Sequence, residues 1–262
     1  MAIPLRRLAV AGLLAAAALL AAAALGPPAS LTAQARRGAP REYVIVHGAW
    51  GGGWDWKAVD SALTARGHHV HRVTLTGLGE RTHLATAQVG LQTHIMDVVN
   101  TIRFEGLRNV ILVGHSYGGM VITGAADQAS DRVSRVVYVD AFLPDSGESL
   151  AQLAGAGFST MVQQSTRDGL IVPAWVPVDA PAPKDVPHPL KTFTDTLRLT
   201  TPAARRIAGH YILTMAPGAT SDDFSPSAVR AQARGFVMDT LRTDHTPERS
   251  AIRGLVRLLL TR

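Results

Sequence analysis

The stretch Gly114-His115-Ser116-Tyr117-Gly118 places a polar serine between two apolar runs, with a glycine two positions away on either side. Core packing alone does not explain a hydroxyl at such a junction. A serine at a sharp turn from strand to helix is held in a strained backbone conformation, and its hydroxyl then projects from the carboxyl edge of the sheet. The pattern therefore predicts that Ser116 is a nucleophile, and a serine that caps the following helix is the alternative.

A serine hydroxyl is a poor nucleophile unless a base takes its proton. In a chain of alternating strands and helices with this serine turn, the base is expected to be a histidine in the loop after the last strand. His245 lies between the apolar segment 235–241 and the closing helical pattern at 248–260. His210 is the only other histidine beyond position 188, and it opens a strand pattern. His245 is therefore predicted to be the base.

The third group of such a site is an acid that fixes the imidazole tautomer and stabilises its charged form. Asp222 and Asp223 are the only acids in the loop that follows the penultimate strand pattern. Asp140 lies at the end of the strand pattern at 135–142, and an acid at that place also reaches the histidine loop. The order of the residues ranks Asp222 first and leaves Asp140 and Asp223 as alternatives.

The negative charge that develops on an attacked carbonyl oxygen needs hydrogen-bond donors that are already in place. The backbone N–H of Tyr117 is one, because this residue follows the nucleophile and opens the next helix. The other is expected in the glycine-rich loop at 47–54, HGAWGGGW, with the N–H of Ala49 as the first choice and that of Trp50 as the alternative. His47 is interpreted as a residue that stabilises this turn.

These candidate residues lie where predicted strands end. Strand patterns occur at 43–48, 69–77, 109–114, 135–142, 210–215 and 235–241, and helical patterns at 54–67, 93–106, 117–129 and 248–260. Strands alternate with helices, and most strand segments are continuous apolar runs, which is typical of a parallel sheet covered on both faces. We therefore predict an α/β protein with a doubly wound, mostly parallel sheet of six strands and helices on both faces.

The segment from about 144 to 205 interrupts this alternation, and six prolines fall within residues 173–189. It is too long for a plain connection between two strands. It contains four apolar anchor residues, namely Trp175, Leu190, Phe193 and Leu197. These anchors favour a lid inserted over the sheet edge rather than a disordered surface insert. A substrate pocket between lid and sheet is expected to be walled by Trp50, Phe142 and Trp175.

Composition narrows the class of protein. The chain has 262 residues, 47% of them hydrophobic, a formal net charge of +6 and no cysteine. This length allows one domain with a large core. The absence of cysteine excludes disulfides, thiolate catalysis and cysteine-ligated zinc. Basic residues are scattered and are not interleaved with aromatic ones, so no nucleic-acid partner is expected.

The N-terminus has the features of an export signal. An arginine pair precedes an apolar run at 9–25, and a small-x-small cleavage pattern follows at 33–35. These features predict a cleaved signal peptide at residues 1–35, a domain at 36–262, and a secreted or periplasmic protein that meets the membrane only through its export signal. An uncleaved membrane anchor is the alternative, and the mass of the mature chain distinguishes the two.

Five segments together resemble the α/β-hydrolase superfamily. They are VIVHGAWGGGWDW, GLQTHIMDVV, VGHSYGGMVITG, VVYVDAFLPDSGESL and TDHTPERS. The nearest branch holds plant methyl esterases, hydroxynitrile lyases and many bacterial esterases, and the likeness is close over residues 43–150 and looser over 205–262. The resemblance implies a triad of Ser116, His245 and an aspartate. It places that acid a few residues before a helix-opening proline, which favours Asp222.

The resemblance also bears on the reaction. The lyases of this branch carry Thr at the position of Gly48 and Lys at the position of Thr246, so this chain has the esterase form at both. The resemblance implies a serine hydrolase, a carboxylesterase that acts on small-molecule esters with no metal and no cofactor. Amidase, lactonase and hydroxynitrile lyase chemistry stay open as alternatives, and so does a non-catalytic ligand-binding protein on the same scaffold.

Overall fold

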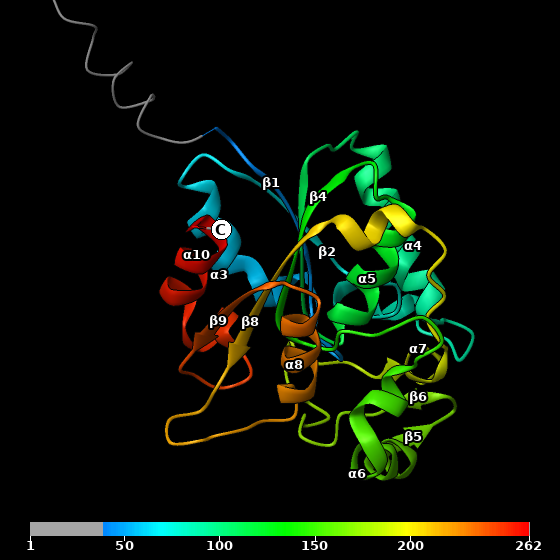
Figure 1. Ribbon diagram of the computed structural model, residues 1–262. Helices are drawn as coiled ribbons and strands as arrows, with labels where there is room; N and C mark the ends of the chain where they lie inside the picture. The colour runs from blue at the N-terminus through cyan, green and yellow to red at the C-terminus, as the bar shows by residue number, and fades with distance from the viewer. Residues whose placement is uncertain (1–38, 262) are drawn as a thin grey trace, which may run out of the picture. The chain divides into compact units, whose positions relative to one another are not determined.

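The computed structural model describes residues 39–261, which contain a six-stranded parallel sheet in the order β2-β1-β3-β4-β8-β9 (Figure 1). The strands are β1 (Glu42–Val46), β2 (His69–Val73), β3 (Val110–Ser116), β4 (Val133–Ala141), β8 (Ala208–Thr214) and β9 (Val237–Leu241). The chain runs from β1 to the edge strand β2 and then returns to β3 on the other side of β1. This confirms the predicted doubly wound sheet, with each predicted strand in place.

The sheet separates two hydrophobic cores. Along β1, Tyr43 and Ile45 belong to one core, and Val44 and Val46 belong to the other. The first core is covered by α3 (Lys57–Thr64) and α10 (Ile252–Thr261), and the second by α4 (Leu91–Phe104), α5 (Gly118–Gln128) and α8 (Ser225–Ala233) (Figure 1). Because helices cover both faces of the sheet, the central strands β1 and β3 carry buried apolar side chains on both sides.

Some predicted elements are shorter than their sequence patterns. The strand predicted at 69–77 ends at Val73, and further on the N–H of Thr76 donates to the Asp97 carboxylate at 2.7 Å instead of to a strand. The N-terminal part of the helix predicted at 54–67 is a 3-10 helix, η1 (Gly53–Trp56). The closing helix is divided at Ala251, which has non-helical dihedral angles, into α9 (Pro247–Ser250) and α10.

The insertion at 144–205 carries its own small elements. They are α6 (Leu150–Ser165), β5 (Thr166–Arg167), β6 (Leu170–Ile171), β7 (His188–Pro189), α7 (Lys191–Thr194) and η3 (Pro202–Arg206), and β5, β6 and β7 form an antiparallel sheet. Two-residue strands have no periodicity, so the sequence did not predict them. Of the predicted anchors, Phe193 and Leu197 are buried and Leu190 is partly buried, whereas Trp175 is 55% exposed.

The predicted signal peptide at 1–35 lies outside the described residues, and it stays a prediction, together with the secreted or periplasmic location. None of the helices within residues 39–261 combines the length and apolar character that a membrane span requires.

Two glycines allow α5 to begin close to the sheet. A Cβ at Gly118 would lie 2.8 Å from the carbonyl oxygens of Val46 and His47. A Cβ at Gly119 would lie 2.0 Å from the carbonyl oxygen of Phe142, which follows β4. Both contacts are with backbone, which cannot move aside as a flexible side chain can. The start of α5 can therefore approach β1 and β4 only without side chains at these positions.

We expect Gly119→Ala to lower the free energy of unfolding by about 3 kcal/mol, because the added methyl group overpacks against backbone. Gly157→Ala is the matched control, since Gly157 is exposed on α6 and has no atom within 4 Å of an added Cβ. That change should be neutral or stabilising by up to about 1 kcal/mol. Urea unfolding followed by circular dichroism measures both, and a Gly119→Ala protein as stable as the wild type would contradict the packing argument.

Candidate active site

Ser116 is the last residue of β3, at the carboxyl edge of the sheet, and its φ is 54°. A positive φ is strained for a residue with a side chain and persists only where the surroundings hold it. The carbonyl oxygen of Ser116 accepts a hydrogen bond from the N–H of Phe142 at 3.1 Å. On its other side lies Gly48, where an added Cβ would be 3.2 Å from the Ser116 Cβ. The serine turn is therefore held between the segments that follow β1 and β4.

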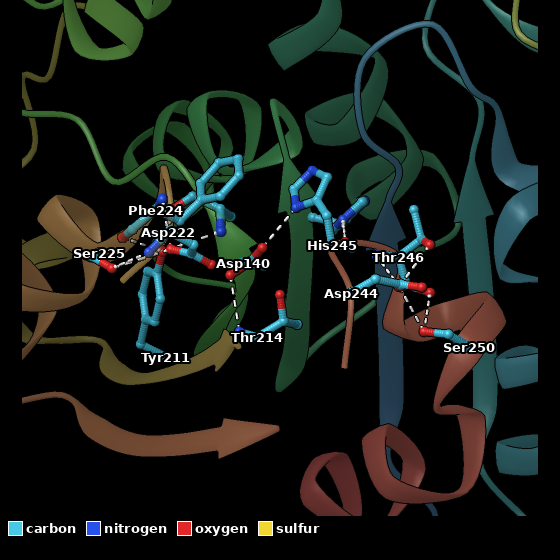
Figure 2. Close-up of polar contacts among 12 residues, drawn as sticks. Asp140, Tyr211, Thr214, Asp222, Phe224, Ser225, Asp244, His245, Thr246 and Ser250 are labelled. Atoms are coloured by element: carbon cyan, nitrogen blue, oxygen red, sulfur yellow. Dashed lines mark hydrogen bonds and ion pairs between the residues drawn. The ribbon is translucent and has the colours of Figure 1, made fainter. Parts of the chain in front are cut away.

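His245 lies in the loop after β9, and the structure places Asp140 beside it. The imidazole Nδ1 is 2.7 Å from Asp140 Oδ2, and Asp140 Oδ1 accepts the N–H of Thr214 at 2.9 Å (Figure 2). Asp140 is 1% exposed, whereas the His245 side chain is 42% exposed. A carboxylate opposite Nδ1 places the ring proton on that nitrogen and leaves Nε2 as an acceptor.

The Ser116 hydroxyl has no hydrogen bond to the His245 imidazole in the part of the chain that the structure describes. Such contacts are often long in the absence of substrate and tighten when it binds. The residue before the serine nevertheless contacts the histidine loop, because the side-chain Nε2 of His115 lies 2.7 Å from the backbone carbonyl oxygen of His245. His115 thus ties the residue before the serine to the histidine loop.

Two aromatic rings pack against the His245 imidazole. Phe224 stacks on it at a centroid distance of 4.6 Å and an interplanar angle of 7°, and His115 lies 4.7 Å away. Burial lowers the pKa of His115 to about 3, so its ring is neutral and its Nε2–H donates to the His245 carbonyl. Sequence reasoning assigned no role to His115, and the only signal was its position as the residue before the serine.

Asp222 and Asp223 have other surroundings. Asp222 Oδ1 accepts the N–H of Phe224 at 2.9 Å and the hydroxyl of Ser225 at 3.2 Å, which stabilises the start of α8 (Figure 2). Burial and the neighbouring charge of Asp140 raise the pKa of Asp222. Asp223 is exposed. The structure therefore brings Asp140 to the imidazole and does not bring Asp222 or Asp223 there, although the order of the residues ranked Asp222 first.

The loop after β1 presents the N–H of Ala49. His47 Nδ1 donates to the carbonyl oxygen of Gly48 at 2.7 Å, and His47 Nε2 accepts the N–H of Leu75 at 3.2 Å. Because the C=O and N–H of a trans peptide point in opposite directions, this bond directs the Ala49 N–H away from His47. The N–H groups of Ala49 and Tyr117 have no acceptor among residues 39–261. Both are free to bind an oxyanion.

The three predicted pocket residues belong to two groups of packed aromatic side chains. Trp50 and Trp175 pack edge to face at 4.9 Å, and Trp50 also packs against Phe193 at 5.7 Å. Phe142 packs against Phe224 at 4.9 Å, and Phe224 in turn stacks on the His245 ring. Aromatic side chains of the insertion therefore pack on the loop that follows β1, and Phe142 and Phe224 lie in sequence beside the His245 ring.

A cavity of about 540 Å³ lies elsewhere, against α5, β4 and η3, and its lining includes none of the candidate catalytic or pocket residues. Within residues 39–261, no three His, Asp or Glu side chains come together as metal ligands would.

Glu248 lies three residues after His245 and is buried at the start of α9, with 2% of its surface exposed. Its Oε2 has no hydrogen-bond partner within residues 39–261. Burial raises the pKa of Glu248 to about 7 from an ordinary value of 4.5. The folded chain therefore binds more protons than the unfolded chain between these two values, so the free energy of unfolding falls as the pH rises through this window.

Comparison with known proteins assigns most of this domain to one family. Residues 43–257 match the family described as "Alpha/beta hydrolase family". A carbendazim hydrolyzing esterase of Nocardioides sp. (strain SG-4G) is 52% identical over 111 residues, which is 42% of this chain and 46% of that protein. Methylesterase 8 of Arabidopsis thaliana is 31% identical over 125 residues, 47% of this chain and 46% of the relative. The chain thus spans about half the length of the curated relatives it matches.

A solved structure extends the likeness over nearly the whole domain. An extracellular alpha/beta-hydrolase from a Paenibacillus species superimposes with a TM-score of 0.72 at 23% sequence identity, and the match covers 84% of this chain and 98% of that one. At this identity the likeness concerns the fold alone.

We expect Glu248→Gln to remove most of the fall in the free energy of unfolding that burial of Glu248 causes as the pH rises from about 5 to 8. The amide has nearly the same shape as the carboxylate and no charge to desolvate. The variant should match the wild type at pH 5 and exceed its free energy of unfolding at pH 8 by about 1–3 kcal/mol. Urea unfolding at a series of pH values measures the difference. Glu105→Gln is the control, since Glu105 is exposed. A variant no more stable than the wild type at pH 8 would contradict this expectation, because it would show that other groups stabilise the charged form of Glu248.

Proposed function

Because the chain belongs to the alpha/beta hydrolase family, we propose that it is a serine carboxylesterase that acts on small-molecule esters. The observation that supports this most strongly is the contact between His245 and the buried Asp140, next to the Ser116 turn. The names of its relatives, an esterase and a methylesterase, point to the same bond type. Methyl esters are therefore the first substrates to examine.

In the proposed first step, Ser116 Oγ attacks the ester carbonyl carbon while His245 Nε2 takes the hydroxyl proton. The Asp140 carboxylate stabilises the positive charge that forms on the imidazole. The N–H groups of Ala49 and Tyr117 bind the oxygen that becomes negative. When the tetrahedral intermediate collapses, His245 gives the proton to the leaving alkoxide, and an alcohol departs from an acyl-enzyme.

The second step repeats the same proton transfers with water. Water attacks the acyl carbon while His245 takes one of its protons. The proton then passes to Ser116 Oγ when the carboxylic acid leaves. The His245 ring is partly exposed, so water can approach it. One water is consumed for each ester cleaved, and no cofactor takes part.

We assign the acid role to Asp140 rather than to Asp222, because only the Asp140 carboxylate contacts the imidazole. Asp222 holds the start of α8 and through it the ring of Phe224, which stacks on His245. Its part in the reaction is therefore indirect. The insertion at 144–205 is proposed to be a lid, since its Trp175 and Phe193 pack on Trp50 of the loop at 47–54, the proposed oxyanion loop.

Lyase chemistry is less well supported than ester hydrolysis. The residue after His245 is Thr246, whose N–H and hydroxyl both donate to Asp244, and Gly48 carries no side chain beside the serine. A non-catalytic ligand-binding protein is the alternative of a different class. Reaction with a serine-directed fluorophosphonate distinguishes an esterase from a non-catalytic binding protein, because only an activated serine is labelled.

Ser116→Ala should lower kcat for short p-nitrophenyl esters by more than about 10⁴-fold, since removal of the nucleophile leaves only binding and oxyanion contacts. The wild type should also be labelled by a fluorophosphonate at Ser116, and the variant should not. Ser61→Ala, on the exposed face of α3, is the matched control and should keep full activity. Undiminished hydrolysis by a folded Ser116→Ala protein would refute the proposed function.

Asp140→Asn should reduce kcat/KM by about 10³–10⁴-fold, because an amide opposite Nδ1 selects the wrong imidazole tautomer. Asp222→Asn should reduce it by less than about tenfold, because it changes only the support of Phe224. Steady-state kinetics on both variants, with circular dichroism to confirm folding, decide between the acids. A larger loss in Asp222→Asn than in Asp140→Asn would transfer the acid role to Asp222.

A further inference from the structure

The backbone at Trp50 is strained. Its φ is 62°, and the N–H of Gly51 donates to the carbonyl oxygen of Ala49 at 2.8 Å, a hydrogen bond that closes a three-residue γ-turn. A γ-turn with a positive φ at its centre is rare, and it persists only where neighbouring groups hold it. This turn directly follows the N–H of Ala49, the proposed oxyanion donor, so whatever holds it also positions that donor.

The insertion holds Trp50 by three hydrogen bonds. The backbone N–H of Trp50 donates to His188 Nδ1 at 3.1 Å, and the carbonyl oxygen of Trp50 accepts the N–H of Val186 at 2.9 Å. The indole N–H of Trp50 donates to the carbonyl oxygen of Ile171 at 3.2 Å. Both peptide groups of Trp50, and its side chain, are therefore fixed by residues more than 100 positions away in the sequence.

The role of His188 depends on its tautomer, which its other contacts determine. The hydroxyl of Thr192 donates to the carbonyl oxygen of Pro189 at 2.8 Å, so it accepts from His188 Nε2, which is 2.7 Å away. Nε2 therefore carries the proton, and Nδ1 offers a lone pair to the N–H of Trp50. His188 is fully buried, and burial lowers its pKa well below the ordinary value, so the ring stays neutral.

His188 also packs on the ring of Tyr117, the residue whose backbone N–H is the second proposed oxyanion donor. Its ring packs edge to face on Tyr117 at 5.0 Å and is tilted against Phe193 at 4.6 Å. The imidazole thus contacts residues that follow β1 and β3, and it reaches them from the insertion. One side chain of the insertion therefore binds the residue after Ala49 and packs on the ring of Tyr117, so it touches a residue at or next to each proposed donor.

We propose that His188 is a positioning residue for catalysis, whose Nδ1 holds the Ala49–Trp50 peptide so that the Ala49 N–H is directed at the substrate oxygen. The same bond occupies the Trp50 N–H, which explains why Ala49 and not Trp50 supplies the donor. This inference rests on the proposed esterase function. In this proposal the insertion covers the oxyanion site and also positions one of its hydrogen-bond donors.

The test compares His188→Leu, which removes the acceptor, with His188→Asn, whose Oδ1 can replace Nδ1. His68→Leu is the matched control, since His68 Nδ1 accepts the backbone N–H of Arg41 at 3.2 Å in a similar contact that involves none of the proposed catalytic residues. Each protein is assayed with p-nitrophenyl acetate and is titrated with a trifluoromethyl ketone, which forms an oxyanion on the serine, and with acetate, which does not.

We expect His188→Leu to lose about 10–100-fold in kcat, with KM changed by less than about threefold, because a misplaced donor acts on the transition state and not on the bound ester. Affinity for the trifluoromethyl ketone should fall by the same factor as kcat, and affinity for acetate should not change. His188→Asn should recover most of both losses. His68→Leu should keep the wild-type kcat.

Thr192→Val is measured alongside, in case His188→Leu does not fold. It removes the acceptor of His188 Nε2–H but leaves the ring in place, and it should lower kcat about tenfold. Wild-type kcat and ketone affinity in a folded His188→Leu or Thr192→Val protein would overturn the positioning role, as would an Asn variant no better than Leu. A wild type that neither cleaves esters nor reacts with fluorophosphonate would instead refute the function itself, and the positioning role with it.

Discussion

The positive φ of Ser116 is the constraint on which the arrangement of the site depends. A serine can keep this conformation between β3 and α5 only if the neighbouring backbone packs tightly around it. Gly48 lies against the serine from the β1 side, and Gly118 and Gly119 allow α5 to start almost in contact with β1 and β4. The proposed nucleophile, the proposed oxyanion loop and the segment after β4 are thus held together by one set of close backbone contacts.

Among the histidines near this turn, the buried ones and the exposed one have different roles. His47, His115 and His188 are buried, and desolvation lowers the pKa of each, so they stay neutral and hold backbone groups with a defined tautomer. His245 alone among these four has a substantially exposed side chain, and it is the one paired with a carboxylate. A proton-transfer group needs access to substrate and water, whereas a group that holds a peptide plane must not change its charge.

The predicted fold could be derived from sequence because its signals are local. Continuous apolar runs such as Val110–Val113 arise from burial on both faces, and their alternation with helical patterns leaves few other arrangements. The insertion is different. Its strands are two residues long and its proline-rich segment has no period, so its contact with Trp50 could not be derived from the sequence. That contact joins positions 138 residues apart.

The sequence by itself determined the class of fold and pointed to Ser116 and His245, because a strand-turn-helix motif and the order of strands along a chain are readable without coordinates. Only the tertiary structure decided which acid meets the imidazole. Asp140 lies at the carboxyl end of β4, and Asp222 follows the neighbouring strand β8, so residue order allows either acid. The path of the long loop after β8 turns Asp222 onto the start of α8 and leaves Asp140 facing His245. Likewise, only tertiary packing brought His188 to Trp50, since the distance between two loops depends on everything that folds between them.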